Sequence, residues 1–209
     1  PLNGSNNRAT GLDDGIITQD ETGDTVSGNT LQNFHDCGIE TVGLVKDTTF
    51  SNNIIKNAWN CGIGGWYWNS MQGNTFSQNK VDNSTQLFQF NRVYALRPNE
   101  SFVYFTNNLF TGNILTNITD NQSRTYIDMT GPPSGIDNSK FVTGNNTFKN
   151  NDFGSGFGPY MAPSSAIIDG GGNKCGPPGP GSPTIPLVCN NPTTICGDGI
   201  LNSGEKCDD

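Results

Sequence analysis

Charged residues are scarce in this chain of 209 residues, at 14% against about 25% in an average globular protein. Hydrophobic residues make up 32%, whereas about 45–50% is usual when glycine is counted with them. The shortfall is filled by 27 glycines, 12 prolines and asparagine at about one residue in seven. Asparagine and glycine are poor helix formers, so this composition excludes a helical bundle. The 12 phenylalanines and 5 tyrosines exclude a disordered chain, which contains few aromatic residues.

Positive charge and long apolar runs are missing as well. Lysine and arginine number 11 against 19 aspartates and glutamates, which gives a net charge of −8. Such an excess disfavours nucleic acid and anionic membrane surfaces as partners. No apolar run approaches the roughly 18 residues that predict a membrane span. We therefore expect neither nucleic-acid binding nor membrane insertion, and we interpret the chain, which does not begin with methionine, as a mature or excised piece of a longer secreted protein.

A short unit, apolar–x–x–Asn–x–apolar, recurs along the chain. Its copies begin at positions 26, 50, 76, 110 and 148, so the early intervals are short and the later ones longer. The recurring asparagines are Asn29, Asn53, Asn79, Asn113 and Asn151. A step of about 24 residues is one turn of a three-faced parallel β-solenoid, in which successive turns stack about 4.7–4.9 Å apart. The apolar columns then form the core, and the asparagine columns form ladders of side-chain amides.

A β-sandwich is the alternative, because short strands separated by turns also suit that fold. A sandwich gives no reason for asparagine to return at one position of every unit. Registered stacking predicts Leu87 beside Ile63. It also predicts loop-rich insertions at residues 92–107 and 120–144. Insertions of this kind tend to gather on one face of a solenoid.

The asparagine-flanked units resemble the right-handed parallel β-helix repeats of the pectate-lyase-like superfamily over roughly residues 12–170. The resemblance implies an all-β, single-stranded right-handed parallel β-helix of about five or six turns, with a disulfide-rich stub at its C-terminal end. It also implies an extracellular, carbohydrate-rich setting, because that superfamily contains polysaccharide lyases, glycoside hydrolases and adhesins. We divide the chain into a β-helix (1–172), a Pro/Gly-rich linker or cap (173–195) and a truncated Cys-rich repeat (196–209).

The six cysteines indicate an oxidising compartment, so we expect a secreted or cell-surface protein. Cys37 and Cys61 occupy the same position one turn apart, which predicts a disulfide worth about 3 kcal/mol on the chain-entropy model. The alternative is two free core thiols. A second, local bridge is expected between Cys175 and Cys189.

The segment from Cys196 to the end of the chain resembles the opening of a Cys-rich repeat known from myxobacterial and other large surface proteins, which is also similar to Notch-type calcium modules. The resemblance implies a Cys196–Cys207 bridge. Calcium is the one cofactor that this segment suggests, because four acidic residues supply the hard oxygen ligands that Ca²⁺ prefers. They are Asp198, Glu205, Asp208 and Asp209. A solvated acidic tail is the alternative.

No catalytic residue is assigned. Hydrolases need two carboxylates about 5–9.5 Å apart, and stacking with the same constant step places Asn60 and Ser84 below Asp36 and Gly64 below Glu40. On this reading no column pairs two carboxylates. His35 and Asp36 form an acid–base pair, although a corner histidine satisfied by backbone is the simpler interpretation. The remaining acids of the first turn suggest a cation site or an acidic solvated loop: Asp13, Asp14, Asp20, Glu21 and Asp24.

Aromatic side chains suggest one more site. Exposed aromatic rings stack on the apolar faces of sugars, so Trp59 and Tyr67 are candidate glycan-binding residues. Asn99 and Asn121 lie in glycosylation sequons within the predicted insertions. We expect a non-catalytic structural or adhesive segment of a larger surface or secreted protein, able to bind a polysaccharide or glycan and to assemble into homo-oligomers or filaments. A polysaccharide lyase or glycoside hydrolase is the alternative.

Overall fold

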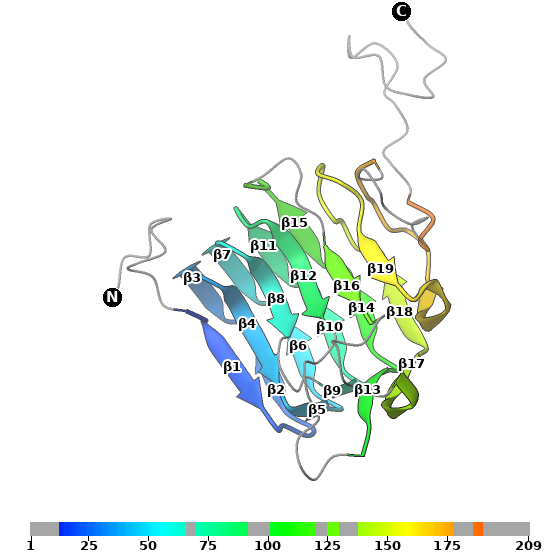
Figure 1. The fold of residues 1–209 in the computed structure, drawn as a ribbon. Coiled ribbons are helices and arrows are strands. Elements are labelled where there is room, and N and C mark those ends of the chain that lie inside the picture. The colour runs from blue at the N-terminus through cyan, green and yellow to red at the C-terminus, as the bar shows by residue number, and fades with distance from the viewer. Residues whose placement is uncertain are drawn as a thin grey trace, which may run out of the picture.

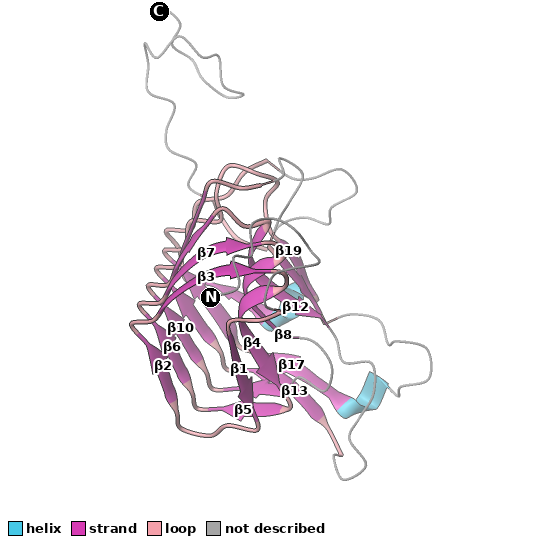
Figure 2. Cartoon of the chain, turned by 90° about the vertical axis from the view of Figure 1, so that its left-hand side faces the viewer, coloured by secondary structure: helices cyan, strands magenta, loops and turns pink. Residues whose placement is uncertain are grey.

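The computed structural model describes residues 13–65, 70–91, 101–119, 125–129, 138–177 and 186–189. Short parallel strands follow one another around an axis and stack rung upon rung along it (Figure 1). Figure 2, which shows the molecule from the N-terminal side of Figure 1, gives a view along the stack. The predicted parallel β-helix is therefore confirmed.

Within the described residues the strands form four sheets, here numbered in the order in which one turn visits them. Sheet I contains β1 (Ile16–Gln19), β4 (Cys37–Val42), β8 (Cys61–Gly65), β12 (Gln86–Asn91), β16 (Tyr126–Asp128) and β19 (Tyr160–Ala162). Sheet II contains β5 (Leu44–Lys46), β9 (Ser70–Gln72), β13 (Val103–Thr106) and β17 (Phe141–Gly144). Sheet III contains β2 (Thr25–Ser27), β6 (Thr49–Ser51), β10 (Thr75–Ser77), β14 (Leu109–Thr111), β18 (Asn146–Lys149) and β20 (Ile167–Asp169). Sheet IV contains β3 (Thr30–Phe34), β7 (Ile54–Ala58), β11 (Lys80–Asp82) and β15 (Ile114–Thr116). Two 3₁₀ turns, Asn138–Lys140 and Ser164–Ala166, complete the described elements.

Three details differ from the sequence-based expectations. Four strands occur in the turns β4–β7, β8–β11 and β12–β15, where three faces were predicted, because a second corner, described below, separates sheets II and III. The predicted insertions contain strands, since β13, β16 and β17 lie inside them and continue the sheets. The partner of Ile63 is Phe88 and not Leu87, because the step from β8 to β12 is one residue longer than the step from β4 to β8.

The predicted asparagine ladder runs along the corner between sheets III and IV. The Asn53 side-chain amide donates to Asn79 Oδ1 at 2.9 Å and to the carbonyl of Val26 at 2.9 Å. Asn53 Oδ1 in turn accepts the backbone and side-chain N–H groups of Asn29. The same pattern links Asn79 to Asn113, Asn113 to Asn151 and Asn151 to Asn173. Each amide therefore satisfies buried backbone groups that the corner leaves without strand partners.

A second ladder, which the sequence analysis missed, runs along the corner between sheets II and III. Asn74 donates through its backbone and side-chain N–H groups to Asn108 Oδ1, and Asn108 donates likewise to Asn146 Oδ1. At the N-terminal end of this ladder the backbone N–H of Thr48 donates to Asn74 Oδ1 at 2.9 Å. Asn74, Asn108 and Asn146 are all buried. This ladder fixes the corner that separates sheets II and III.

Between the two ladders, sheet III points a column of phenylalanines into the core. The stacked rings of Phe50, Phe76, Phe110 and Phe148 have centroids 4.7, 4.8 and 4.3 Å apart. All four side chains are fully buried. Burial of one such side chain stabilises the fold by about 1.5–3 kcal/mol. The buried aromatic column thus lies between the two asparagine ladders.

The corners explain why asparagine and glycine are so frequent. Gly28, Asn52, Gln78, Gly112 and Asn150 share one corner position, and each has a positive φ of 54–68°. Left-handed backbone costs most L-residues about 1 kcal/mol or more, and glycine and asparagine tolerate it best. The tight turns therefore select these residue types wherever the chain changes sheets.

Two disulfides lie within the described residues. Cys37 is bonded to Cys61 across adjacent rungs of sheet I, with Cα atoms 4.6 Å apart. Cys175 is bonded to Cys189, and Cys189 also pairs through a backbone bridge with Asn173, the last member of the first ladder. The predicted Cys196–Cys207 bridge lies outside the described residues.

Candidate functional site

A hollow of about 450 Å³ opens where the first two rungs of sheet I begin. It is lined by Asp13, Asp14, His35, Asp36, Glu40, Trp59 and Asn60. We call these seven residues the acidic hollow. They come from the segment before β1, from β4 with its preceding corner and from the corner between β7 and β8.

The register between β1 and β4 brings the acids together. Ile16 pairs with Ile39 and Ile39 pairs with Ile63, so the first step along sheet I is one residue shorter than the second. Just before the paired strands, the backbone N–H of Asp36 donates to the carbonyl of Asp13 at 2.7 Å. Asp13 and Asp36 therefore occupy one column. The prediction that no column pairs two carboxylates is wrong. It assumed one constant step between turns, and it compared Asp36 only with residues of later turns and not with those of the first turn.

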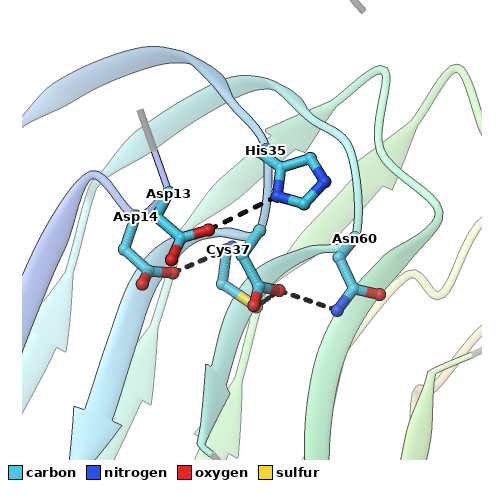
Figure 3. Close-up of polar contacts among 6 residues, drawn as sticks. Asp13, Asp14, His35, Cys37 and Asn60 are labelled. Atoms are coloured by element: carbon cyan, nitrogen blue, oxygen red, sulfur yellow. Dashed lines mark hydrogen bonds and ion pairs between the residues drawn. The ribbon is translucent and has the colours of Figure 1, made fainter. Parts of the chain in front are cut away.

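His35 lies between an acid and an aromatic ring. Its Nδ1 atom is 3.3 Å from Asp13 Oδ1 (Figure 3). Its ring is parallel to that of Trp59, with centroids 5.7 Å apart and an interplanar angle of 1°. The side chain of His35 is thus held by side chains, where the sequence analysis preferred backbone partners.

Two further polar contacts hold the floor of the hollow. Asp14 Oδ1 accepts the backbone N–H of Cys37 at 3.1 Å, and the Asn60 side-chain amide donates to Asp36 Oδ1 at 2.7 Å (Figure 3). Because Cys37 carries the disulfide to Cys61, the carboxylates are fixed to a cross-linked pair of rungs. The geometry of the hollow is therefore largely set before any ligand arrives.

Crowding of carboxyl groups shifts their proton affinities. Burial raises the pKa of Glu40 to about 8, and contacts with Asp14 and the charges of Asp36 and Asp13 act in the same direction. Burial also raises the pKa of Asp36, which the hydrogen bond from Asn60 partly offsets. At neutral pH Glu40 therefore keeps its proton and can donate a hydrogen bond.

The hollow gathers some of the predicted site residues and leaves others out. Trp59 is at its rim and 38% exposed. Asp20, Glu21 and Asp24, which were grouped with Asp13 and Asp14, do not line it. Several predicted sites lie outside the described residues: Tyr67, Asn99 and Asn121, and the calcium ligands Asp198, Glu205, Asp208 and Asp209.

Residues 3–92 match a family model described as periplasmic copper-binding protein (NosD), a family of parallel β-helices. Comparisons with curated proteins and with solved structures gave no match. The matched segment contains the acidic hollow and the first rungs of the β-helix. Together with the two disulfides, the match indicates an extracellular or periplasmic location. None of the helices in the described part of the chain is long and apolar enough to cross a membrane.

The described residues offer no thiolate or thioether site of the kind that selects Cu(I). Soft sulfur ligands select Cu(I), whereas nitrogen and oxygen ligands suit Cu(II), and the chain contains a single histidine and three methionines. The methionines, Met71, Met129 and Met161, are buried in the core. Asp14, Asp36 and Cys37 bring one ligand atom each within 4.8 Å of one another, but Cys37 is in a disulfide and offers no thiolate. What remains around His35 is a set of carboxylate oxygens.

Proposed function

We propose that this chain is a non-catalytic, extracytoplasmic segment of a larger surface or secreted protein, where it acts as a rigid structural or adhesive rod that binds a glycan. The observation that carries the proposal is the first asparagine ladder, which runs from Asn29 to Asn173, with the second ladder and a stacked phenylalanine column beside it. Every turn is tied to the next by side chains as well as by strands. Six rungs of sheet I span roughly 24 Å at the usual strand spacing.

The acidic hollow supports the glycan-binding part of the proposal. It combines an exposed aromatic side chain, Trp59, with an amide, Asn60, and several carboxyl groups. Aromatic faces pack on the C–H faces of sugar rings, and carboxyl and amide groups bind their hydroxyls. These are the elements of a sugar site on a rigid scaffold.

Incubation with a panel of neutral, acidic and amino-containing polysaccharides tests the proposal. Affinity electrophoresis measures retention, while assays for reducing ends and for unsaturated products measure cleavage. We expect retention by at least one polymer without turnover. Measurable turnover would overturn the non-catalytic assignment, and no retention by any polymer would overturn glycan binding.

A polysaccharide hydrolase or lyase is the second candidate, favoured by the paired carboxyl groups of the hollow. Glu40, with its pKa raised to about 8, has the protonation state of a general acid, and Asp14 and Asp36 lie beside it. If turnover is found in the panel, Glu40→Gln should abolish it, because glutamine keeps the shape of the side chain but cannot deliver a proton.

Three further hypotheses from the sequence stay proposals. Light scattering tests assembly into homo-oligomers or filaments. Calcium titration of the intact chain, followed by calorimetry and repeated with Asp198→Asn, tests the C-terminal calcium site. Limited proteolysis tests the proposed division of the chain near residues 172 and 195.

A further inference from the structure

We propose that the acidic hollow binds the protonated amino group of an amino-sugar unit, so that the glycan recognised by this rod is a cationic one. The inference rests on the proposed glycan-binding function and narrows its ligand class. It depends on three features of the hollow: its charge, its aromatic wall and its fixed floor.

The charge of the hollow selects the sign of the ligand. Asp13, Asp14 and Asp36 place three carboxyl groups around one space. Among the described residues, no lysine or arginine lines it, and the basic group present, His35, is already engaged by Asp13. A uronic acid would bring a fourth carboxylate into this group and would be repelled. An ammonium group would instead receive charge-assisted hydrogen bonds from the acids.

The aromatic wall selects a sugar over a cationic peptide. Trp59, whose ring is parallel to that of His35, is 38% exposed as a residue and lies beside the carboxyl groups. A pyranose ring packed on this wall would bring a substituent amine toward the acids and a hydroxyl toward Asn60. The hollow, at about 450 Å³, is large enough for one or two sugar units.

The fixed floor favours binding without rearrangement. Asp14 is held by the backbone of Cys37, and Asp36 is held by Asn60. Both contacts are anchored by the Cys37–Cys61 bridge. The carboxyl groups of the hollow are held close together in the free protein, so a bound cation relieves the repulsion between them. The positive charge also favours the ionised form of Glu40, which should lose its proton when the cation binds.

The test is isothermal titration calorimetry at pH 7 with three tetrasaccharides of matched length. They are a glucosamine oligomer, its N-acetylated neutral counterpart and a galacturonate oligomer. We expect the glucosamine oligomer to bind at least about tenfold more tightly than the N-acetylated one, which corresponds to one charge-assisted hydrogen bond. We expect no detectable binding of galacturonate.

Variants place the binding in the hollow. Asp36→Asn should weaken glucosamine binding about tenfold but leave binding of the neutral oligomer nearly unchanged, and Trp59→Ala should weaken both. Asp47→Asn is the matched control, because Asp47 is an exposed acid at the corner between β5 and β6, outside the hollow. It removes the same charge and should change neither affinity. Circular dichroism and thermal melting check that each variant is folded.

The outcomes separate this inference from the proposed function. Equal binding of the glucosamine and N-acetylated oligomers, or equal effects of Asp36→Asn and Asp47→Asn, would overturn the cationic-sugar inference and leave glycan binding intact. Binding of an oligolysine of equal charge as tightly as the glucosamine oligomer would also overturn it, since it would show a charge site and no sugar site. If none of the three oligosaccharides binds and the polysaccharide panel is negative, both proposals fail.

Discussion

Removal of one amide from the middle of the first ladder is the sharpest test of how the β-helix is stabilised. Asn79 is fully buried. Its side chain donates to the carbonyl of Phe50 and to Asn113 Oδ1, each at 2.9 Å. Its Oδ1 accepts the backbone N–H of Asn53 at 3.1 Å and the Asn53 side-chain amide at 2.9 Å. Asn79→Ala deletes all four contacts and leaves their partners buried.

The expected cost follows from those stranded partners. The backbone N–H of Asn53 and the carbonyl of Phe50 lose the side-chain groups that satisfied them. A buried group left without a partner costs about 1–3 kcal/mol. Two such groups, with a small cavity added, predict a loss of about 3–5 kcal/mol in the free energy of unfolding.

The same substitution at the first rung is the control. Asn29 is only half-buried, and its side chain donates to Asn53 Oδ1 and to the carbonyl of Ser27. Asn29→Ala should therefore cost about 1 kcal/mol. Urea unfolding followed by circular dichroism measures both variants, with hydrogen exchange to detect local opening of the rungs. If the two substitutions cost the same, the ladder does not act as a buried network and the reasoning is refuted.

Three more perturbations test the first rungs. Replacing Cys37 and Cys61 together by serine should lower the free energy of unfolding by about 3 kcal/mol, measured by urea unfolding; no loss would show that the bridge adds nothing to the ladders. Gly64→Ala would place a Cβ atom 2.6 Å from Cys61 Sγ and 2.8 Å from Cys37 Sγ. We therefore expect a lower free energy of unfolding and a larger fraction of unpaired Cys37 and Cys61, measured by thiol titration. The same number of free thiols as in the wild-type protein would contradict this. Because the pKa of Glu40 rises from 4.5 to about 8 on folding, the folded state holds a proton that the unfolded state releases between these values, and stability should fall as pH rises through that window. Glu40→Gln should flatten this part of the stability–pH curve, and an unchanged curve would assign the effect to other groups.

The fold could be predicted from sequence because its main interactions repeat at fixed offsets. An asparagine three residues after an apolar residue recurs because one corner must be satisfied in every turn. The second ladder carried a weaker signal. Its position, two residues before the phenylalanine of sheet III, is asparagine at Asn74, Asn108 and Asn146 but threonine at Thr48. Because asparagine is missing from the start of this series, the sequence alone does not predict the second ladder or the separate strands of sheet II.

The candidate site was harder to predict because it depends on steps that are not constant. From β1 through β4 and β8 to β12, each step along sheet I is one residue longer than the step before it. A change of one residue moves every side chain to a different neighbour. The longer step from β8 to β12 places Phe88 beside Ile63. The shorter step from β1 to β4 places Asp13 in the same column as Asp36. Corner lengths decide such steps, and corners carry no apolar pattern from which their length can be read.

The column that contains Asp13, Asp36 and Asn60 shows how a function can be built into a repeat. Elsewhere stacked amides satisfy one another because each both donates and accepts. In this column only Asn60 is an amide, and its side chain donates to Asp36. Two ionised carboxylates cannot donate to each other, so the column gives up ladder bonds and gathers charge above the disulfide. Acids therefore replace amides in this column, and their mutual repulsion is concentrated in the acidic hollow. A cationic ligand bound there would relieve that repulsion, which adds to its binding free energy.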